Sequence, residues 1–549
     1  MSHNPWGLTS RRVVLPFLSV CLLFEIFRVT ELPSNSQSGN QSIALQRGLD
    51  ALKDGRSEQA LEALTVAEHE NPGDPRIRNF RAITLAQLGK PADAEAEYRE
   101  AIRLDGKFED AWRNLGFLLW TDHRLDDSRT ALLHAIALSP DDTFAHYYLG
   151  RVELEAQHYA DAFHELNLSG MTLPDDPEFR IQAAQGYVAL GEKEKAVKIL
   201  RQAATQDLHG LEAAQIGSIL VVLHEYAPAI ELLKKTSEHE PGESGWAQFD
   251  LSLTYLLSGD YEQAVEQSHT YIEHQSRGIP GVTAAAAGWS LLGIAEARLG
   301  ERERAIAALK QAAQAEPGNE EHWLNLTREL METSRYADAI AATENGIAAI
   351  PKSYALHLRL GAAQLAAGRY KEAEKEFREL VDAHDPLATS YVGLAQVLLR
   401  EGRAEEAVGV VAAAEKELGP NFLLTYFTGL ALDRAGKRTE AINAFRQAIH
   451  LNPDSAEAHL GLGKSELAAG QTKEAIAELQ EALRLQPGNA PARRLLSQAY
   501  LRNGDSKKAE EFADSPSDKP ATAEGDLLED FLLPKWEMPE KEKINRLIG

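Results

Sequence analysis

An interval of 34 residues separates equivalent small residues along most of this chain. In the first half, Ala60, Ala94, Ala162 and Ala196 keep this phase, and Ser128 takes the intervening place. A period of this length is typical of stacked supersecondary units, each of which contacts mainly its neighbours. The chain is therefore predicted to form a solenoid and not a single globular core. In the second half the spacing is unbroken, at Ala305, Ala339, Ala373, Ala407, Ala441, Ala475 and Ala509.

Each repeat is predicted to contain two helices. Between residues 456 and 489, the first helix carries the small residue Gly463 and ends at Gly470, because glycine readily takes the left-handed conformation that follows a helix. The second helix has apolar residues spaced by three and four, such as Leu479, which form one apolar face. It ends before Pro487, because a proline there would remove a helical hydrogen bond.

The repeats carry a known pattern, Trp-x2-Leu-Gly in the first helix and Ala-x3-Phe followed by Pro in the second. On these residues the chain resembles the tetratricopeptide repeat family. The resemblance implies an all-α fold, a right-handed superhelical solenoid of about 14 antiparallel helix pairs of 34 residues. It also implies that the first helices line a concave groove. The matching residues are Trp112, Leu115 and Gly116; Trp289, Leu292 and Gly293; and Ala441, Phe445 and Pro453.

The phase of the pattern also divides the chain. Residues 41–278 are predicted to form the first half of the array and residues 286–513 the second half. Between them lies an inserted loop at 279–285, which Pro280 and Gly281 indicate. We interpret this loop as a bend in one continuous array, and the alternative is a boundary between two solenoids. The repeats start at Gln41, Pro75, Glu109, Thr143, Pro177, Gly210, Gly245, Ala286, Glu320, Tyr354, Ala388, Phe422, Ala456 and Ala490.

The N-terminal residues 1–30 have a basic pair, Arg11 and Arg12, followed by an apolar run. A basic start before about 7–15 apolar residues is the pattern of an export signal. These residues are therefore predicted to be an export signal or an N-terminal anchor, followed by a linker at 31–40. The protein is expected to be exported, periplasmic or anchored in the cell envelope, with a cytoplasmic location as the alternative. It is expected to meet a membrane only through this segment, if the segment stays uncleaved.

The C-terminal residues 514–549 lose the repeat pattern. They are predicted to form a disordered acidic tail, because Asp, Ser, Pro and Lys dominate its first part. Within the tail, residues 526–533 place Leu527, Leu528 and Phe531 beside acidic residues, which is an amphipathic pattern. This segment is expected to occupy the groove of its own solenoid or to bind a partner, and the plainer alternative is a cap on the last repeat.

Charge and motifs restrict the function. The chain has 57 Lys and Arg against 83 Asp and Glu, a net charge of −26, which argues against nucleic acid as the main partner. Residues Gly461 to Ser465 resemble the end of a phosphate-binding loop, but Ala458 stands where the motif requires glycine. The His and Glu residues do not have the spacing of a zinc site. The sequence therefore predicts a protein that is not an enzyme and that uses no cofactor or metal.

The family resemblance implies that positions 2, 5, 9, 12 and 13 of each repeat face the groove. Aromatic residues with arginine are the usual chemistry of binding hot spots. Cations also gather near position 13, where the dipole of a helix end offers a structural alternative. The candidate partner-binding residues are Arg113, Phe117, Trp120, Phe144, Tyr147 and Arg151 in the first half, and Arg298, Arg328, Arg400, Arg434 and Lys464 in the second.

Two functions are compatible with these features. The favoured one is a protein-protein interaction scaffold that holds peptide or helical segments of other proteins in the groove. The alternative is an accessory or regulatory subunit of an envelope polysaccharide-synthesis, glycosyl-transfer or export machinery. A guide for a carbohydrate polymer is expected to repeat an aromatic residue at one groove position along many repeats. Here the aromatic residues gather in a few repeats, which favours protein partners.

Overall fold

This computed structural model describes residues 43–172, 174, 176–204, 208, 210–239, 245–277, 282–383 and 387–512. Every regular element in the described part of the chain is an α-helix, which confirms the predicted all-α class. None of the described helices combines the length and the apolar character that a membrane span requires. The predicted export segment at 1–30, the linker at 31–40, the tail at 514–549 and its segment at 526–533 lie outside the described residues.

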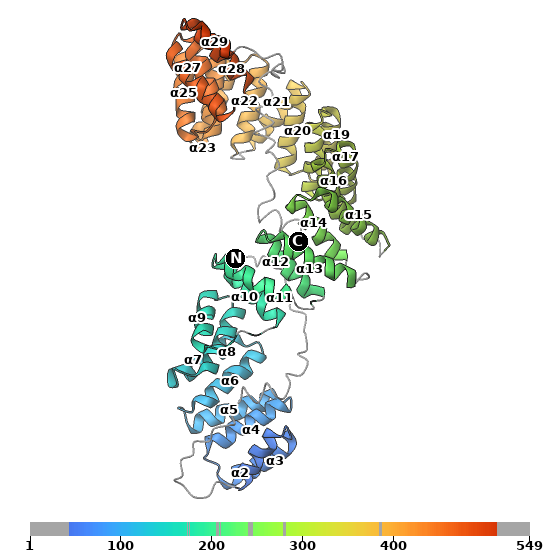
Figure 1. The fold of residues 1–549 in the computed structure, drawn as a ribbon, viewed down its shortest axis with the longest axis vertical. Coiled ribbons are helices and arrows are strands. Elements are labelled where there is room, and N and C mark those ends of the chain that lie inside the picture. The colour runs from blue at the N-terminus through green and yellow to red at the C-terminus, as the bar shows by residue number, and fades with distance from the viewer. Residues whose placement is uncertain are drawn as a thin grey trace. The chain divides into compact units, whose positions relative to one another are not determined.

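The chain divides into two compact units, residues 1–240 and 241–549. The described residues of the first unit form six helix pairs, and each helix packs against the next along the chain (Figure 1). Its helices are α2 (Ile43–Lys53), α3 (Ser57–Glu70), α4 (Pro75–Gln87), α5 (Pro91–Leu104), α6 (Glu109–Thr121), α7 (Leu125–Leu138), α8 (Thr143–Glu155), α9 (Tyr159–Ser169), α10 (Pro177–Ala189), α11 (Lys193–Ala204), α12 (Gly210–Val222) and α13 (Tyr226–His239).

In the part of the second unit that the structure describes, eight helix pairs show the same consecutive packing. Its helices are α14 (Gly245–Ser258), α15 (Tyr261–Arg277), α16 (Val282–Arg298), α17 (Arg302–Ala315), α18 (Glu320–Glu332), α19 (Tyr336–Ala349), α20 (Tyr354–Ala366), α21 (Tyr370–Asp382), α22 (Ala388–Arg400), α23 (Ala404–Leu418), α24 (Phe422–Arg434), α25 (Arg438–Leu451), α26 (Ala456–Ala468), α27 (Thr472–Leu485), α28 (Ala490–Arg502) and α29 (Ser506–Glu511).

The inserted loop predicted at 279–285 is shorter at its C-terminal end than expected. Residues 282–285 belong to α16, and residues 278–281 lie outside the described residues. Helices α15 and α16 each have 17 residues, where most helices of the chain have 13 or 14. The extra residues are therefore taken up mainly by longer helices. The two long helices pack against each other within the second unit.

The first helix of a repeat begins at the predicted residue in every repeat except the first and the eighth. The residue before it explains this accuracy, because Asp, Asn and Ser accept hydrogen bonds from the free backbone N–H groups of a helix start. Asp142, for example, accepts from the backbone N–H groups of Phe144 and Ala145. The same contact occurs at Asp74, Asp176, Asn319, Ser353, Asn421, Ser455 and Asn489.

First helices of adjacent repeats lie close together. Helix α6 contacts α4 and α8, and α20 contacts α18 and α22, whereas second helices pack mainly against the first helices on either side. In a curved stack of helix pairs, neighbouring helices on the inner face are closer to one another than neighbouring helices on the outer face. Within each unit the first helices therefore line the inner face.

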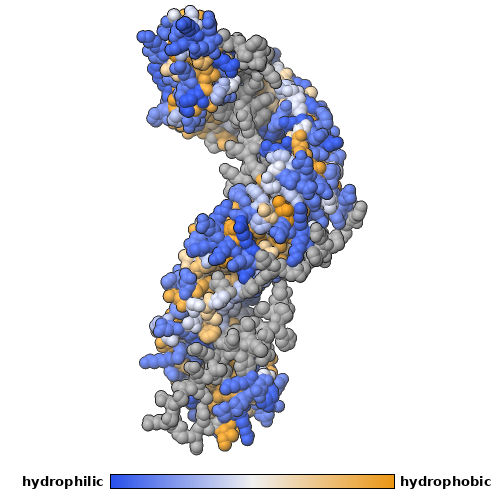
Figure 2. Space-filling view, viewed as in Figure 1, coloured by the Kyte–Doolittle hydropathy of each residue, from blue (hydrophilic) through white to orange (hydrophobic). Residues whose placement is uncertain are grey.

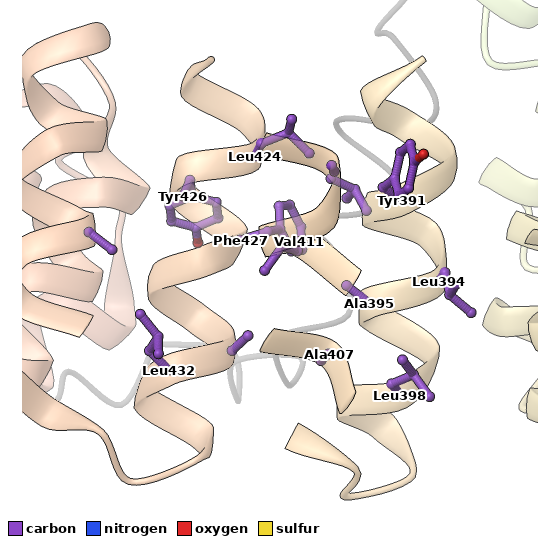
Figure 3. Packing of buried hydrophobic residues seen from close by; sticks show 14 of the residues in the cluster. Tyr391, Leu394, Ala395, Leu398, Ala407, Val411, Leu424, Tyr426, Phe427 and Leu432 are labelled. Atoms are coloured by element: carbon purple, nitrogen blue, oxygen red, sulfur yellow. The ribbon is translucent and has the colours of Figure 1, made fainter. Parts of the chain in front are cut away.

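The two helices of a repeat cross where small residues allow close approach. Ala407 and Ala441 are fully buried on α23 and α25. Where Ser128 replaces the alanine, its hydroxyl donates to the Gly116 carbonyl at 2.7 Å, so the added oxygen is satisfied. Larger apolar residues fill the space between repeats, and Figure 3 shows a part of this core formed by α22, α23 and α24.

Five turns between repeats share a hydrogen bond from a ring N–H at the fourth residue of the first helix. This N–H donates to the carbonyl of the residue six positions earlier, which joins the helix to the preceding turn. The pairs are Trp112 with Gly106 (3.1 Å), His146 with Pro140 (2.9 Å), Trp323 with Pro317 (2.9 Å), His357 with Pro351 (3.2 Å) and His459 with Pro453 (3.0 Å).

A left-handed residue ends most first helices, and it is usually glycine, as at Gly470 with φ of 82°. Gln157 takes this place after α8 with φ of 64° and an exposed side chain. A residue with a Cβ atom costs about 1–2 kcal/mol there. Replacing Gln157 with glycine is therefore expected to raise the stability of the protein by about 0.5–1 kcal/mol, after the entropy of the unfolded glycine is subtracted.

Chemical denaturation followed by circular dichroism measures this effect. The control is Gln311→Gly, which changes an exposed residue inside α17 and is expected to cost about 1 kcal/mol. Equal loss of stability in both variants would contradict the left-handed turn.

Candidate partner-binding surface

The surface of the described helices is mostly hydrophilic in the view of Figure 2, and hydrophobic residues form small groups on it. Hydropathy therefore does not single out a partner-binding surface in this view, and particular side chains must identify it. The sequence predicts two sets on the first helices, one in each unit.

In the first unit, the predicted aromatic residues come together on α6 and α8. The Phe117 ring lies 6.0 Å from the Trp120 ring and 4.8 Å from the Tyr148 ring, measured between centroids. Tyr147 and Phe144 of α8 pack against the same group, and both are partly buried. These aromatic residues thus form one continuous group across two adjacent repeats.

Arg151 extends this group to α10. Its guanidinium carbon lies 5.0 Å from the centre of the Trp120 ring and 4.7 Å from that of Phe179. A cation over an aromatic face is attracted by the electron-rich ring. Arg151 also donates to the Tyr147 hydroxyl at 3.1 Å. We name this group the aromatic–arginine cluster; it consists of Phe117, Trp120, Phe144, Tyr147, Tyr148, Arg151 and Phe179.

Polar contacts fix the edge of the aromatic–arginine cluster. Trp120 Nε1 donates to Glu155 Oε2 at 2.9 Å, and the other oxygen of Glu155 contacts His123 Nδ1 at 3.1 Å. Phe117, Trp120, Tyr147 and Arg151 are partly exposed, so the cluster is ordered and still open to a partner.

Arg113 has a different environment from the other predicted residues. It forms ion pairs with Asp110 at 2.5 Å and with Asp142 at 2.8 Å, and only 12% of its side chain is exposed. Asp142 also accepts from the first N–H groups of α8. Arg113 therefore links two adjacent repeats, and its charge is already compensated.

In the second unit, the predicted cations lie on five first helices. Arg298, Arg400 and Arg434 are exposed at the last turns of α16, α22 and α24. Lys464 of α26 forms an ion pair with Asp433 at 3.3 Å. The helix dipole favours cations at helix ends, which accounts for part of this pattern.

Arg328 of α18 is partly buried, and burial together with the charge of Arg298 lowers its pKa. The structure adds Arg359 of α20, which the sequence analysis missed because it occupies position 6 of its repeat. Only 8% of Arg359 is exposed, and burial together with the charge of Arg328 lowers its pKa to about 9. The basic set thus includes a buried arginine beside a second arginine.

Family models described as tetratricopeptide repeat match several parts of the chain and together cover more than half of it. The matched residues are 45–107, 113–169, 286–329, 330–390, 388–413, 428–490 and 466–524.

The chain is also similar to Superkiller complex protein 3 of Mus musculus, with 23% identity over 347 residues. This match covers 59% of the chain but 21% of the mouse protein, so the chain spans about a fifth of that relative's length.

Similar solved structures include a tetratricopeptide repeat protein from Parabacteroides merdae, with 16% identity and a TM-score of 0.40, covering 46% of this chain and 98% of that one. Yeast Tom70 has 14% identity and a TM-score of 0.37, covering 84% of this chain and 99% of that one. Family models of the tetratricopeptide repeat match more than half of the chain, and each repeat in the described residues forms one helix pair. This chain belongs to the tetratricopeptide repeat family.

Proposed function

We propose that this protein is an interaction scaffold that holds peptide or helical segments of other proteins on the inner face of its first helices. The aromatic–arginine cluster of α6, α8 and α10 carries this proposal. Trp, Tyr and Arg dominate the energetics of protein interfaces, because they bury a large area and also offer polar contacts. Here they are gathered on consecutive first helices and remain partly exposed.

The order of the cluster supports this role. Arg151 is held by two rings and the Tyr147 hydroxyl, and Trp120 is held by Glu155. Side chains that are fixed before binding lose less conformational entropy when a partner arrives, so less of the interaction energy is lost in ordering them.

The distribution of aromatic residues favours protein over carbohydrate polymer. The cluster is restricted to α6, α8 and α10, whereas a polymer guide is expected to repeat its aromatic residue along the array. The net charge of −26 further disfavours nucleic acid, whose phosphates would be repelled.

Peptides selected from a displayed random library against the full chain provide a test. The variant Trp120→Ala combined with Arg151→Ala is expected to weaken the selected peptides at least about tenfold, because hot-spot residues each contribute about 2 kcal/mol or more. Titration calorimetry measures the affinity, and circular dichroism confirms that the variant is folded. Tyr336→Ala, on the second helix α19, is the control and is expected to leave the affinity unchanged. Failure to select peptides, or equal affinities for both variants, would argue against this surface.

A further inference from the structure

Glu153, Glu296 and Glu466 occupy the same position of the 34-residue period, nine residues before the small residue of the helix crossing. They lie near the ends of the first helices α8, α16 and α26, and each is at most 6% exposed. A carboxylate loses its hydration when it is buried, so it needs a cation or hydrogen-bond donors in compensation. The three repeats therefore meet the same electrostatic requirement at this position.

In two of these repeats an arginine of the preceding second helix provides the compensation. Arg129 of α7 pairs with Glu153 at 2.5 Å, and Arg446 of α25 pairs with Glu466 at 2.7 Å. The arginines stand one and five residues after the crossing position of their helices. Both are about half exposed, so each arginine side chain reaches the buried carboxylate from the outer surface of the array.

The repeat of Glu296 lacks this arginine. Its preceding second helix is α15, which carries Val265 and His269 at the two equivalent positions. Arg304 of α17 is near enough to favour the charged form of Glu296, but its ion pair is with Glu301, at 3.7 Å. Among the described residues nothing forms a hydrogen bond or an ion pair with the Glu296 carboxylate, and burial raises its pKa.

A pocket of about 460 Å³ occupies the place of the missing arginine. Its lining includes Val265 and His269 of α15, Trp289 and Glu296 of α16, and Ala308 of α17. The pocket opens between two second helices, on the side of the array away from the inner face. Glu296 Oε2 is enclosed by the protein and Oε1 is not, so a ligand in the pocket reaches the carboxylate at Oε1.

We propose that this pocket takes an arginine side chain of a partner protein, which binds Glu296 as Arg129 and Arg446 bind the equivalent glutamates. A guanidinium is less strongly hydrated than an ammonium and stacks on aromatic rings, so it suits a buried carboxylate beside Trp289. The aliphatic part of the arginine would pack against the apolar wall of the pocket. The pocket lies outside the inner face, so this inference does not rest on the proposed function.

A fluorescein-labelled hexaarginine peptide tests the pocket on the full chain at physiological salt. Glu296→Gln is expected to weaken hexaarginine at least about fivefold, because it removes the carboxylate that the guanidinium binds. Glu344→Gln removes the same charge from an exposed place on α19 and is expected to change the affinity less than about twofold. Equal affinities of the two variants would mean that the peptide binds the acidic surface in general, which would overturn the site.

Hexalysine tests the assignment to arginine, because it carries the same charge without guanidinium groups. It is expected to bind at least about threefold more weakly than hexaarginine. Equal binding of the two peptides would overturn the assignment. N-acetylarginine amide has one guanidinium and no flanking peptide, and it is expected to bind far more weakly than hexaarginine. If it binds as tightly, the pocket belongs to a small guanidino compound and the partner assignment is wrong.

His269→Arg tests the same geometry within the chain, because it places an arginine at the position that Arg446 has in its own repeat. The new guanidinium is expected to pair with Glu296, to raise the melting temperature and to weaken hexaarginine at least about fivefold. Combined with Glu296→Gln, the same substitution is expected to give no rise in melting temperature. An unchanged melting temperature and an unchanged affinity in His269→Arg would overturn the proposal, and this test stands even if Glu296→Gln fails to fold.

Thermal unfolding without peptide separates binding from a structural role of Glu296. Glu296→Gln is expected to melt at the same or a higher temperature than the native protein, because it removes a buried charge that no described group pairs with. A lower melting temperature with unchanged hexaarginine affinity would make Glu296 structural and the proposal wrong. Peptides selected for the aromatic–arginine cluster are expected to bind Glu296→Gln normally, so failure of this site leaves the proposed function standing.

Discussion

Replacing Gly293 with alanine is expected to destabilise the second unit by about 1–3 kcal/mol, because the added methyl group overpacks a helix crossing. A Cβ atom at Gly293 would lie 2.6 Å from Leu309 Cγ and 3.0 Å from the backbone oxygen of Ala305. The side chain can move, but the backbone oxygen belongs to α17 and cannot withdraw without shifting the helix. The usual gain of about 1 kcal/mol for alanine over glycine in a helix offsets only part of this cost.

The matched control is Gly409→Ala in α23. Gly409 is exposed, and a Cβ atom there would meet nothing within 4 Å. The same substitution is therefore expected to stabilise the protein by about 0.5–1 kcal/mol. Repeat arrays need not unfold in one step. The hydrogen exchange of the backbone amides in α16 and α17 is therefore measured together with the denaturation curves. Effects of the same sign in both variants would contradict close approach as the reason for glycine at 293.

The 34-residue spacing of small residues predicted where the two helices of a repeat cross, because these helices approach each other closely at the same position in every repeat. Helix starts were predictable for a similar reason, since Asp142 and Ser455 mark them with capping chemistry. The insertion was less predictable. Pro280 and Gly281 indicate a loop, but a loop signal does not show how far the flanking helices extend toward it.

The candidate surface was predictable only in part. The sequence placed Phe117, Trp120 and Arg151 on one face, and the structure brings them into contact. It could not show that Arg113 is held by two carboxylates, because an ion pair depends on side-chain positions in the next repeat. Arg359 was missed because the fixed groove positions exclude position 6, although Arg359 is buried on α20 and the charge of Arg328 acts on it.

His459 is expected to make the stability of the second unit depend on pH. Nε2 faces the Pro453 carbonyl at 3.0 Å, and Nδ1 faces Glu478 Oε2 at 2.7 Å. Both partners are acceptors, so only the doubly protonated imidazolium can donate to both. The bond to Glu478 raises the pKa of His459, the Pro453 carbonyl and Glu481 act in the same direction, and burial opposes them.

The sign of the pH effect follows from this raised pKa. Unfolded histidine has a pKa of about 6.5. The additional stability from His459 is therefore fully present below about pH 6.5 and is lost as the pH rises through the higher pKa of the folded state. Phenylalanine keeps a ring at this position and removes both hydrogen bonds. His459→Phe is expected to cost about 2–3 kcal/mol near pH 6 and about 1 kcal/mol near pH 8.5.

Denaturation midpoints of the native protein and of His459→Phe, compared across this pH range, measure the difference. His450→Phe is the matched control, because His450 is exposed at the end of α25 and makes no hydrogen bond to the described residues. It is expected to leave the pH dependence unchanged. The same arrangement joins His146 to Glu165 at 2.6 Å in the first unit, and the pKa of His146 is also raised. If the cost of His459→Phe is the same at both pH values, the imidazolium does not hold this turn, and His459 contributes only through its neutral hydrogen bond.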